Sequence, residues 1–363
     1  MSASRLDQVK SCHFGYFMEY GLRARERTKA DFQAPEVGTF IHYLLENVLR
    51  EVEQQGKRPE RPALAALVRR YTDEYVRTVI DVYGEKSARF RYLFSRLRET
   101  ALVIVENVLD ELEHSDFRPV AFELGFGGKN GQLPAVTVTA GDTTLSVTGK
   151  VDRVDGWLKN GKLYLRVVDY KTGKKDFDYC DVFNGVGLQM LLYMFALKSS
   201  GSDMLGDRPV AAGVQYFPAR APYLTSDGKL TAEEAEQERI SKWKRKGLLL
   251  NDEDVLQAME PGDAPKRMCY SVKKDGTISG DLADCQQLKL LEGYVFRILS
   301  RLVEDIVSGN VEPNPYTRGS THDFCPYGPV CHPAAVEGRR SYKMMDAQRF
   351  WEEIGKEMGD HGG

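Results

Sequence analysis

The segment GKVDRVDGWLKNGKLYLRVVDYKTGKK, residues 149–175, carries two aspartates whose spacing could build a metal site. Asn160 and Gly161 stand between two runs of alternating polarity, which is the strongest short signal for a β-hairpin. A two-residue loop there fixes the register and places Asp152 directly opposite Asp169. Directly opposed residues have β-carbons about 4.5–5.5 Å apart and project to the same face.

The face that these aspartates share is expected to point into the core. Leu163, Leu165 and Val167 mark this face on the second strand, and Asp169 and Lys171 continue it. A carboxylate pair at a buried face is costly unless a cation neutralises it, and hard cations such as Mg²⁺ take carboxylate oxygens. The alternative is a surface hairpin end with ordinary ion pairs, and a bulge in either strand would destroy the register.

Three further polar residues lie on expected helices. Gln189 and Tyr193 are four positions apart and share one helix face. They could be a functional pair, or a packed tyrosine beside a glutamine on the helix surface. His42 has apolar neighbours early in a helix, where a lone histidine is more often structural than a ligand.

Two cysteines near the C-terminus form a second candidate site. The stretch THDFCPYGPVCHP, residues 321–333, contains Cys325 and Cys331, with His322 ahead of both. The six cysteines of the chain are too few and too scattered for a disulfide framework. In a reducing compartment a close pair is more often part of a metal site than a bridge.

The polarity pattern predicts one α/β domain with a helical region before its sheet. Residues 1–114 have helical spacing, and alternating strands begin at Phe117. Further elements are expected in the following ranges: a helix at 179–198, a strand at 210–217, and helices at 231–245, 282–308 and 344–357.

Composition excludes several classes of protein. The 363 residues are 42% hydrophobic and 28% charged, which is typical of a globular chain. We find no apolar run of membrane-spanning length and no signal-peptide pattern at the start, so a cytoplasmic location is expected. The net charge of −3 argues against bulk attraction to nucleic acid. Basic segments at 171–175 and 242–246 could still form a local groove, or a solvated surface.

Taken in order, these motifs resemble the RecB-type branch of the PD-(D/E)xK nucleases, as found in AddAB-type helicase–nucleases, over nearly the whole chain. The family's helical histidine motif matches GTFIH and implies that His42 binds metal. Its GxxDRxD motif matches GKVDRVD, which implies that Asp152 is a ligand. DYK matches the (D/E)xK motif and implies Asp169 as a ligand and Lys171 as the catalytic lysine. QxxxY matches Gln189 and Tyr193, which would orient the site or contact DNA.

The resemblance also implies a fold and a chemistry. The fold is an α/β PD-(D/E)xK restriction-endonuclease-like core, a mixed central sheet flanked by helices, with helical insertions. The chemistry is phosphodiester hydrolysis with Mg²⁺ or Mn²⁺. Lys171 would orient the attacking water or offset developing charge. Glu123, on the strand before the hairpin, is a further candidate for supporting the metal, or else an ordinary strand-edge charge.

The same family holds a [4Fe–4S] cluster with one cysteine near the start of the domain and three near its end. Cys12, Cys325 and Cys331 match three of these positions, and the fourth position is occupied by His322. A set of three cysteines and a histidine suits an iron–sulfur cluster or tetrahedral Zn²⁺, and a degenerate site without metal is the third reading.

The family implies an exonuclease domain that degrades the 5′-ended strand beside a motor, with DNA and an AddA-type helicase–nuclease subunit as partners. The chain has no G-x-x-x-x-G-K-[ST] motif, so ATP-driven activity would come from sequence outside it or from a partner, and we expect an excised domain. The nuclease domain is expected over 1–340, with a helical region at 1–114 and a cysteine loop at 320–333, and a helical tail at 341–363. The alternatives are a catalytically idle DNA-end-binding clamp and a stand-alone recombination exonuclease.

Overall fold

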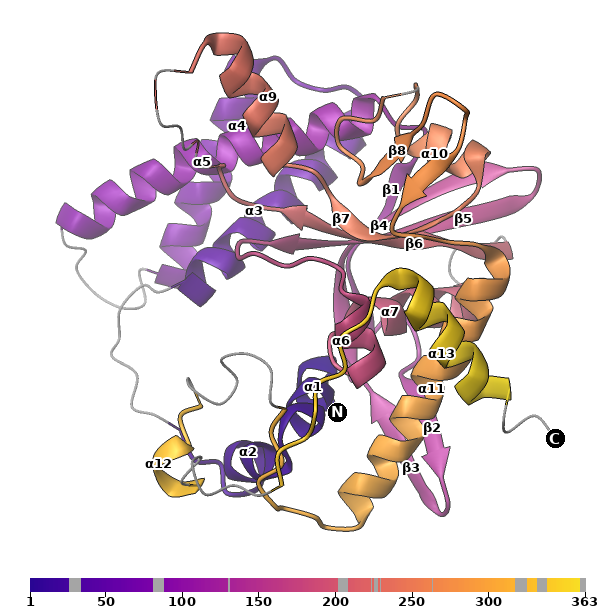
Figure 1. Cartoon of the computed structure of the whole chain (residues 1–363). Helices are drawn as coiled ribbons and strands as arrows, with labels where there is room; N and C mark the ends of the chain where they lie inside the picture. The colour runs from indigo at the N-terminus through magenta and orange to yellow at the C-terminus, as the bar shows by residue number, and fades with distance from the viewer. Residues whose placement is uncertain are drawn as a thin grey trace.

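The computed structural model has a central sheet with helices on both sides (Figure 1). It describes residues 1–25, 34–80, 88–129, 131–201, 208–222, 224, 228, 230–262, 264–316, 325–331 and 338–359.

The central sheet has six strands in the order β1-β4-β5-β6-β7-β10. Pairs β5–β6 and β7–β10 are parallel, and the other neighbouring pairs are antiparallel. The mixed sheet that the family resemblance implied is therefore confirmed. Its strands are β1 (Arg118–Phe126), β4 (Gly149–Lys159), β5 (Lys162–Lys171), β6 (Arg208–Pro218), β7 (Lys246–Leu250) and β10 (Leu282–Ala283).

Two small antiparallel ribbons and the helices complete the described fold. The ribbons pair β2 (Val136–Ala140) with β3 (Thr143–Val147) and β8 (Tyr270–Val272) with β9 (Ile278–Gly280). The helices are α1 (Ala3–Ser11), α2 (His13–Tyr16), η1 (Phe17–Gly21), α3 (Ala34–Gln55), α4 (Arg61–Tyr75), η2 (Val76–Ile80), α5 (Ala88–Glu113), α6 (Tyr179–Asn184), α7 (Gln189–Ser200), α9 (Ala232–Lys242), α10 (Glu253–Met259), α11 (Cys285–Val307), α12 (Gly328–Cys331) and α13 (Ala347–Gly359). None of these described helices combines the length and the apolar character that crossing a membrane requires.

The β4–β5 hairpin has the predicted register. The loop residues Asn160 and Gly161 both have positive φ angles, 52° and 69°, as a two-residue hairpin turn requires. The ladder runs from the Lys159–Lys162 pair to the Arg153–Val168 pair without a shift. A sequence signal of two residues was therefore sufficient to align the strands that carry Asp152 and Asp169.

The helix expected at 179–198 is two helices, so that prediction was wrong in one respect. Gly185 and Gly187, with φ angles of 80° and 69°, separate α6 from α7. Such positive φ angles end a right-handed helix and favour glycine. The break lets Gln189 begin α7, at the N-terminal end of that helix.

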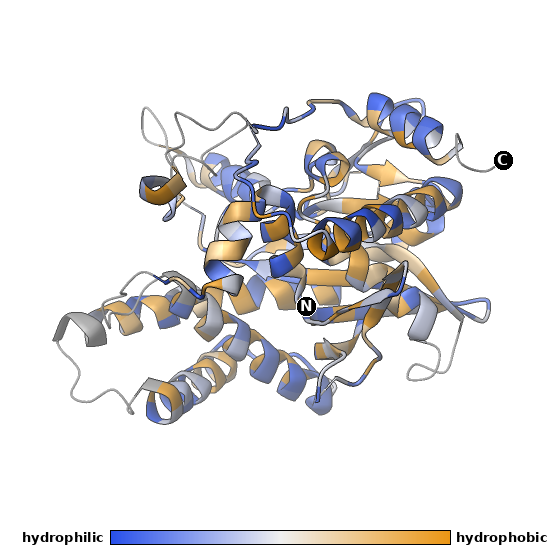
Figure 2. Cartoon of the chain, turned by 90° about the horizontal axis from the view of Figure 1, so that it is seen from below, coloured by the Kyte–Doolittle hydropathy of each residue, from blue (hydrophilic) through white to orange (hydrophobic). Residues whose placement is uncertain are grey.

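The sheet is buried on both faces, whereas the sequence pattern predicted a single core-facing side. Leu163, Leu165 and Val167 of β5 pack in the core formed with α1, α6, α7, α11 and α13. Val168 and Tyr170 pack on the opposite face, in the core formed with α3, α4 and α5. Figure 2 shows the hydrophobic strands in the middle of the molecule, with hydrophilic residues on the outer sides of the helices. Helices cover both faces, as is usual where a sheet contains parallel strands.

A fully buried ionic cluster ties α5 to the sheet. Its five charged residues are each at most 2% exposed, and they are Glu111, Arg153, Asp155, Arg166 and Arg245.

Glu111 of α5 is the centre of this ionic cluster. Its Oε1 accepts hydrogen bonds from Arg153 (3.2 Å) and Arg166 (3.0 Å), and its Oε2 accepts one from Arg245 (2.6 Å). Asp155 Oδ2 also accepts from Arg166, at 2.7 Å. Burial raises the pKa of Glu111, but the three arginines outweigh burial and hold it at about 2. Arg245 lies in the basic segment 242–246, so the prediction of a groove or solvated surface there was wrong for this residue.

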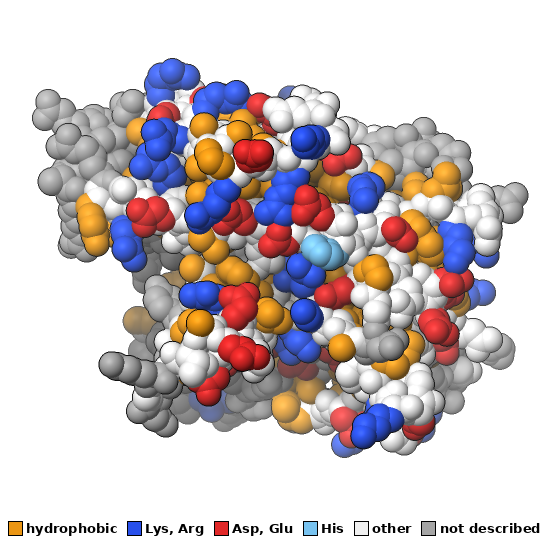
Figure 3. All heavy atoms as spheres, turned by 90° about the horizontal axis from the view of Figure 1, so that it is seen from above, with side chains coloured by type: hydrophobic (Ala, Val, Ile, Leu, Met, Phe, Trp, Pro, Cys, Tyr) orange, Lys and Arg blue, Asp and Glu red, His pale blue; other side chains and the backbone are white. Residues whose placement is uncertain are grey.

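Charges on the outer surface are mixed. Figure 3, which views the molecule from above, shows Lys and Arg side chains interspersed with Asp and Glu. Interspersed charges give a weak net field, which agrees with the net charge of −3. Attraction of an anionic ligand to this face would therefore rest on local contacts.

We predict that Glu111→Gln lowers the free energy of unfolding by about 3–5 kcal/mol near neutral pH, because it leaves three guanidinium groups around one carboxylate. The pKa of Glu111 is lower in the folded protein than its ordinary value of 4.5. Its contribution is therefore complete above pH 4.5 and is lost as the pH falls toward about 2. Denaturant titrations of both proteins at about pH 7 and about pH 3 should show the gap between them shrinking.

A matched control is Glu292→Gln, which breaks a half-exposed ion pair with Lys198. Such pairs contribute about 0–1 kcal/mol, so this variant should differ little from wild type at either pH. Equal losses in the two variants would contradict a special role for the ionic cluster.

Candidate functional site

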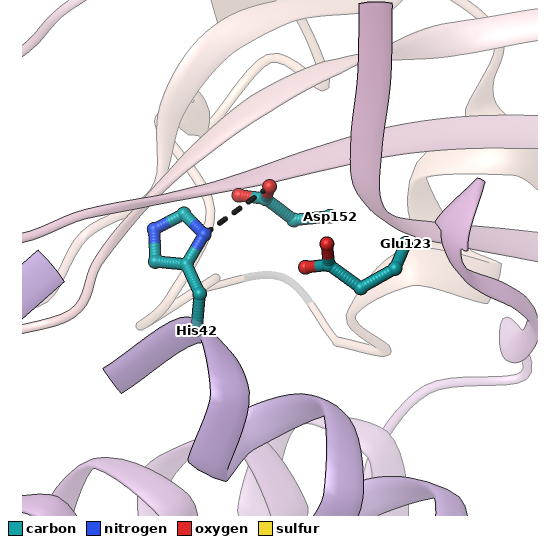
Figure 4. A group of neighbouring side chains, drawn as sticks. All are labelled: His42, Glu123 and Asp152. Carbon is teal, nitrogen blue, oxygen red and sulfur yellow. Dashed lines mark ion pairs between the residues drawn. The ribbon is translucent and has the colours of Figure 1, made fainter. Parts of the chain in front are cut away.

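Residues from four elements meet at one end of the central sheet. His42 comes from α3, Glu123 from β1, Asp152 from β4, and Asp169 with Lys171 from β5. Figure 4 shows the His42, Asp152 and Glu123 side chains directed toward one another. The helix holds His42 in place because Phe40, Ile41, Leu44 and Leu45 around it are buried against the sheet.

His42 makes two contacts that fix its ring. Its Nδ1 lies 3.3 Å from Asp152 Oδ1, and its Nε2 lies 2.8 Å from the carbonyl oxygen of Tyr170. Burial lowers the pKa of His42, but Asp152 and the Tyr170 carbonyl outweigh burial, so the pKa is raised. The ring is thus oriented by a carboxylate on one strand and a peptide group on the next.

The two strands separate where Asp152 enters the site. The β4–β5 ladder ends at the Arg153–Val168 pair, one residue short of the expected Asp152–Asp169 pair. The Tyr170 N–H then donates to Asp152 Oδ2 at 2.8 Å. The Asp152 side chain therefore accepts from the Tyr170 N–H beyond the end of the ladder. The other oxygen of the Asp152 carboxylate, Oδ1, faces His42.

Asp169 lies beside Asp152 and is paired with Lys171. The lysine Nζ lies 2.7 Å from Asp169 Oδ2. Burial and the nearby Asp152 charge raise the pKa of Asp169 to about 6, although Lys171 and His42 act in the opposite direction. Two carboxylates that oppose each other's ionisation are favourable in charged form when a cation binds between them.

Glu123 belongs to the same site. Phe122 pairs with Arg153 and Leu124 with Val151, so Glu123 stands opposite Asp152. Its φ angle is 51°, a strained left-handed conformation that costs about 1–3 kcal/mol in a residue other than glycine. Such strain concentrates at functional sites.

His42, Glu123 and Asp152 form a donor set that fits a divalent metal. One ligand atom of each lies within 4.8 Å of the other two, and among the described residues this is the one such group. The two carboxylates suit Mg²⁺ or Mn²⁺, which prefer oxygen ligands, and the imidazole supplies a third donor. Asp169 lies outside this compact group but within electrostatic reach of both Asp152 and His42.

Gln189 and Tyr193 are in contact and lie next to the start of β4. The Gln189 side-chain amide donates to Tyr193 Oη at 3.2 Å, and the backbone N–H of Lys150 donates to the same oxygen at 3.3 Å. The Tyr193 ring is 4% exposed and stacks on Phe126 with centroids 5.4 Å apart. The geometry makes this pair a support for β4 two residues before Asp152.

Gly149 explains the glycine of the GKVDRVD segment. A Cβ at this position would lie 2.0 Å from Tyr193 Oη. Any side chain would displace the tyrosine, so the close approach of β4 to α7 requires glycine.

Of the three predicted cysteines of the second site, Cys331 lies within electrostatic reach of both Cys12 and Cys325, although the three thiols are less closely grouped than the donor atoms of His42, Glu123 and Asp152. Cys12 lies between α1 and α2, while Cys325 and Cys331 come from the C-terminal part of the chain. Burial, then the neighbouring Cys325 and Cys12 thiols, raise the pKa of Cys331. His322 lies outside the described residues.

Hydrogen bonds also join the two ends of the chain near Cys12. The backbone N–H of His13 donates to Asn314 Oδ1 at 2.8 Å. Arg340 donates to the carbonyl oxygens of Asn314, at 2.7 Å, and of Ser11, at 3.0 Å. These contacts hold the backbone around Cys12 against Asn314 and Arg340, which precede and follow Cys325 and Cys331 in the sequence.

Two residues with roles in the site were missed from the sequence. Tyr170 contacts both His42 and Asp152 through its backbone, and its hydroxyl accepts a hydrogen bond from Arg153 at 3.0 Å. Lys150 forms an ion pair with Glu123. Their positions inside the two motifs were the available signal, but backbone contacts and partners on other strands have no sequence pattern.

Comparison with known proteins agrees with this geometry. The profile of the PD-(D/E)XK nuclease superfamily matches residues 1–332. The chain belongs to the PD-(D/E)XK nuclease superfamily. The family resemblance proposed from the sequence, and its mixed α/β fold, are thus confirmed.

Three curated relatives share one name, which describes a subunit of an ATP-dependent helicase/deoxyribonuclease. The protein of Acetivibrio thermocellus is 33% identical over 359 residues, covering 95% of this chain and 31% of the relative. The protein of Thermoanaerobacter pseudethanolicus is 31% identical, and the match covers 99% of this chain and 32% of the relative. The protein of Clostridium tetani is 30% identical, and the match covers 91% of this chain and 30% of the relative. The chain therefore spans about a third of the length of the curated relatives it matches.

We predict that Gly149→Ala lowers the free energy of unfolding by about 1–3 kcal/mol, the usual cost of overpacking. The reason is the contact with buried Tyr193. Gly173→Ala is the control, because a Cβ there meets nothing within 4 Å, and it should not destabilise the protein. Denaturant titration measures both.

Combining Gly149→Ala with Tyr193→Ala should cost less than the two single changes together, since removal of the ring relieves the clash. Simple additivity would show that the two positions are independent.

Proposed function

We propose that this chain is a metal-dependent DNA exonuclease domain that hydrolyses phosphodiester bonds. The convergence of His42, Glu123, Asp152, Asp169 and Lys171 at one end of the sheet is the observation that carries the proposal. Membership of the nuclease superfamily supports the reaction class.

The relatives support a more specific assignment. Their shared name contains both helicase and deoxyribonuclease. We infer that the chain acts as the nuclease domain of an AddAB-type complex, with an AddA-type helicase–nuclease subunit as partner. It would degrade the 5′-ended strand at double-strand breaks, in the cytoplasm.

The donor atoms of His42, Glu123, Asp152 and Asp169 would hold Mg²⁺ or Mn²⁺. Such an ion lowers the pKa of water and stabilises charge on phosphate oxygens. Tyr170 keeps His42 and Asp152 in their positions through its peptide groups. Gln189 and Tyr193 hold the strand that carries Asp152.

Lys171 has two roles in this proposal. Its ammonium compensates Asp169 and so keeps that buried carboxylate in place. Its side chain is 35% exposed, so the same ammonium also reaches solvent, where it can orient water or offset charge on the phosphate.

We propose that Cys12, Cys325 and Cys331 hold a [4Fe–4S] cluster, with His322 at the fourth family position. Support comes from the position of both other thiols near Cys331. The cluster would crosslink residues more than 300 positions apart in the chain, which restricts the unfolded state. It would then act as a structural staple rather than as part of the hydrolytic site.

Asp169→Asn tests the hydrolytic function. Cleavage of single-stranded DNA in Mg²⁺ should fall by at least about 100-fold, because a charged metal-binding oxygen is lost. DNA binding should persist, and the melting temperature of the metal-free protein should not fall. The melting temperature should not fall because the pKa of Asp169 is raised to about 6 in the folded protein. Above that pH the charged carboxylate opposes folding, and the neutral amide of Asn removes this charge.

Asp116→Asn is the control, because Asp116 is exposed and lies on the loop before β1. It should retain full activity. If wild type and Asp169→Asn both bind DNA and neither cuts it, the chain is an idle clamp and the enzymatic proposal is wrong.

Cys331→Ala tests the staple. We expect it to lower the free energy of unfolding by about 2–5 kcal/mol and to weaken DNA binding at the same time. Exposed Cys285→Ala should change neither property. Purified wild type should be brown and contain iron and sulfide, whereas colourless protein with zinc would replace the cluster by Zn²⁺. An unchanged melting temperature in Cys331→Ala would refute the structural role.

A further inference from the structure

An ion pair connects the metal-binding group to the protein surface. Glu123, whose side chain is 15% exposed, pairs with Lys150, whose side chain is 61% exposed. Lys150 lies two residues before Asp152 on β4, and Glu123 lies on the neighbouring strand β1. The Lys150 ammonium therefore stands at the surface next to the carboxylate that completes the His42–Glu123–Asp152 group.

Lys150 and Lys171 each neutralise a different carboxylate of the site. Lys171 pairs with Asp169, and Lys150 pairs with Glu123. Glu123 is the main cause of the raised pKa of Lys150, and Glu46 and Asp152 add to the attraction. Lys150 is thus held in place by the same carboxylates that would bind a cation.

A divalent cation at this group changes the forces on Lys150. It would neutralise Glu123 and Asp152, and it would repel the nearby ammonium. The lysine side chain is a flexible stem with a compact charge, so it can move without disturbing the backbone. The Lys150 backbone is held separately, by its N–H bond to Tyr193.

We propose that Lys150 is a metal-gated phosphate contact. Without metal its ammonium neutralises Glu123, and with metal bound it is released to a phosphate of the DNA strand next to the site. This inference rests on the proposed nuclease function. Metal binding and DNA binding then reinforce each other. The metal takes Glu123 away from Lys150, which frees Lys150 for a phosphate, and the phosphate takes Lys150 away from Glu123, which frees Glu123 for the metal.

The proposal predicts opposite changes for Lys150→Gln in two binding measurements. Without DNA, Mn²⁺ should bind about 2- to 5-fold more tightly by calorimetry, because the competing ammonium is gone. With Ca²⁺, which also takes oxygen ligands, a single-stranded oligonucleotide should bind more weakly. A purely structural role for Lys150 would weaken both, and that result would overturn the proposal.

The salt dependence of DNA binding isolates the gating step. Each phosphate contact on a single strand contributes about 0.7 to the slope of log affinity against log salt. In Ca²⁺, Lys150→Gln should reduce this slope by about that amount. In EDTA the same substitution should not change the slope, because in the wild type without metal the Lys150 ammonium is paired with Glu123 and does not contact a phosphate. An equal reduction in both conditions would show an ungated contact and would overturn the proposal.

Two variants serve as controls. Lys150→Arg keeps the charge and should keep the wild-type slope. Lys198→Gln removes a part-exposed lysine that pairs with Glu292 at 2.6 Å, between α7 and α11, and should leave metal binding unchanged.

Failure of this inference differs from failure of the proposed function. Wild type that cuts DNA in Mg²⁺, with Lys150→Gln identical to it in both binding assays, would leave the nuclease and remove the gate. Wild type that neither binds Mn²⁺ nor cuts DNA would remove both.

Discussion

The buried ionic cluster around Glu111 is the constraint on which the rest of the fold depends. Charged groups in a dry interior are tolerated only when each has partners in good geometry. Glu111 therefore fixes α5 relative to Arg153 of β4, Arg166 of β5 and Arg245 just before β7. A shift of the helix by one turn would leave several charges unpaired.

The same cluster reaches the functional site through one tyrosine. Arg153 donates to the Tyr170 hydroxyl, while the backbone of Tyr170 contacts Asp152 and His42 on either side. The GKVDRVD segment thus serves two faces of one strand. Asp152 faces the site, whereas Arg153 faces Glu111 of α5 and also donates to Asp155, as the two-residue period of a strand requires. Asp152 and Asp169 lie just beyond the last pair of the β4–β5 ladder, where the two strands separate.

The N-terminal and C-terminal segments of the chain lie against each other in the fold. Helices α1 and α13, from opposite ends of the chain, both contact α11, and Phe350 and Ile354 of α13 enter the main core. Contacts between segments so far apart in sequence limit the unfolded chain when a crosslink joins them. Cys12 lies at this junction, between α1 and α2, and does not belong to the group formed by His42, Glu123 and Asp152.

The sequence by itself determined the hairpin register, the helical region before the sheet and most of the residues that meet at the site, but it did not predict strand β7 or the two separate helices within 179–198. Asn160-Gly161 aligned the strands because a two-residue turn leaves one pairing, and this pairing with the alternation along each strand assigned Asp152 and Asp169 to one face. The tertiary structure decided the rest. No sequence pattern links Arg166 to Glu111, which α5 brings to it, and the two interpretations of Glu123 stay open until α3 brings His42 near it. Local periodicity records which side of an element is polar, but not whether another element, distant in sequence, supplies the opposite charge.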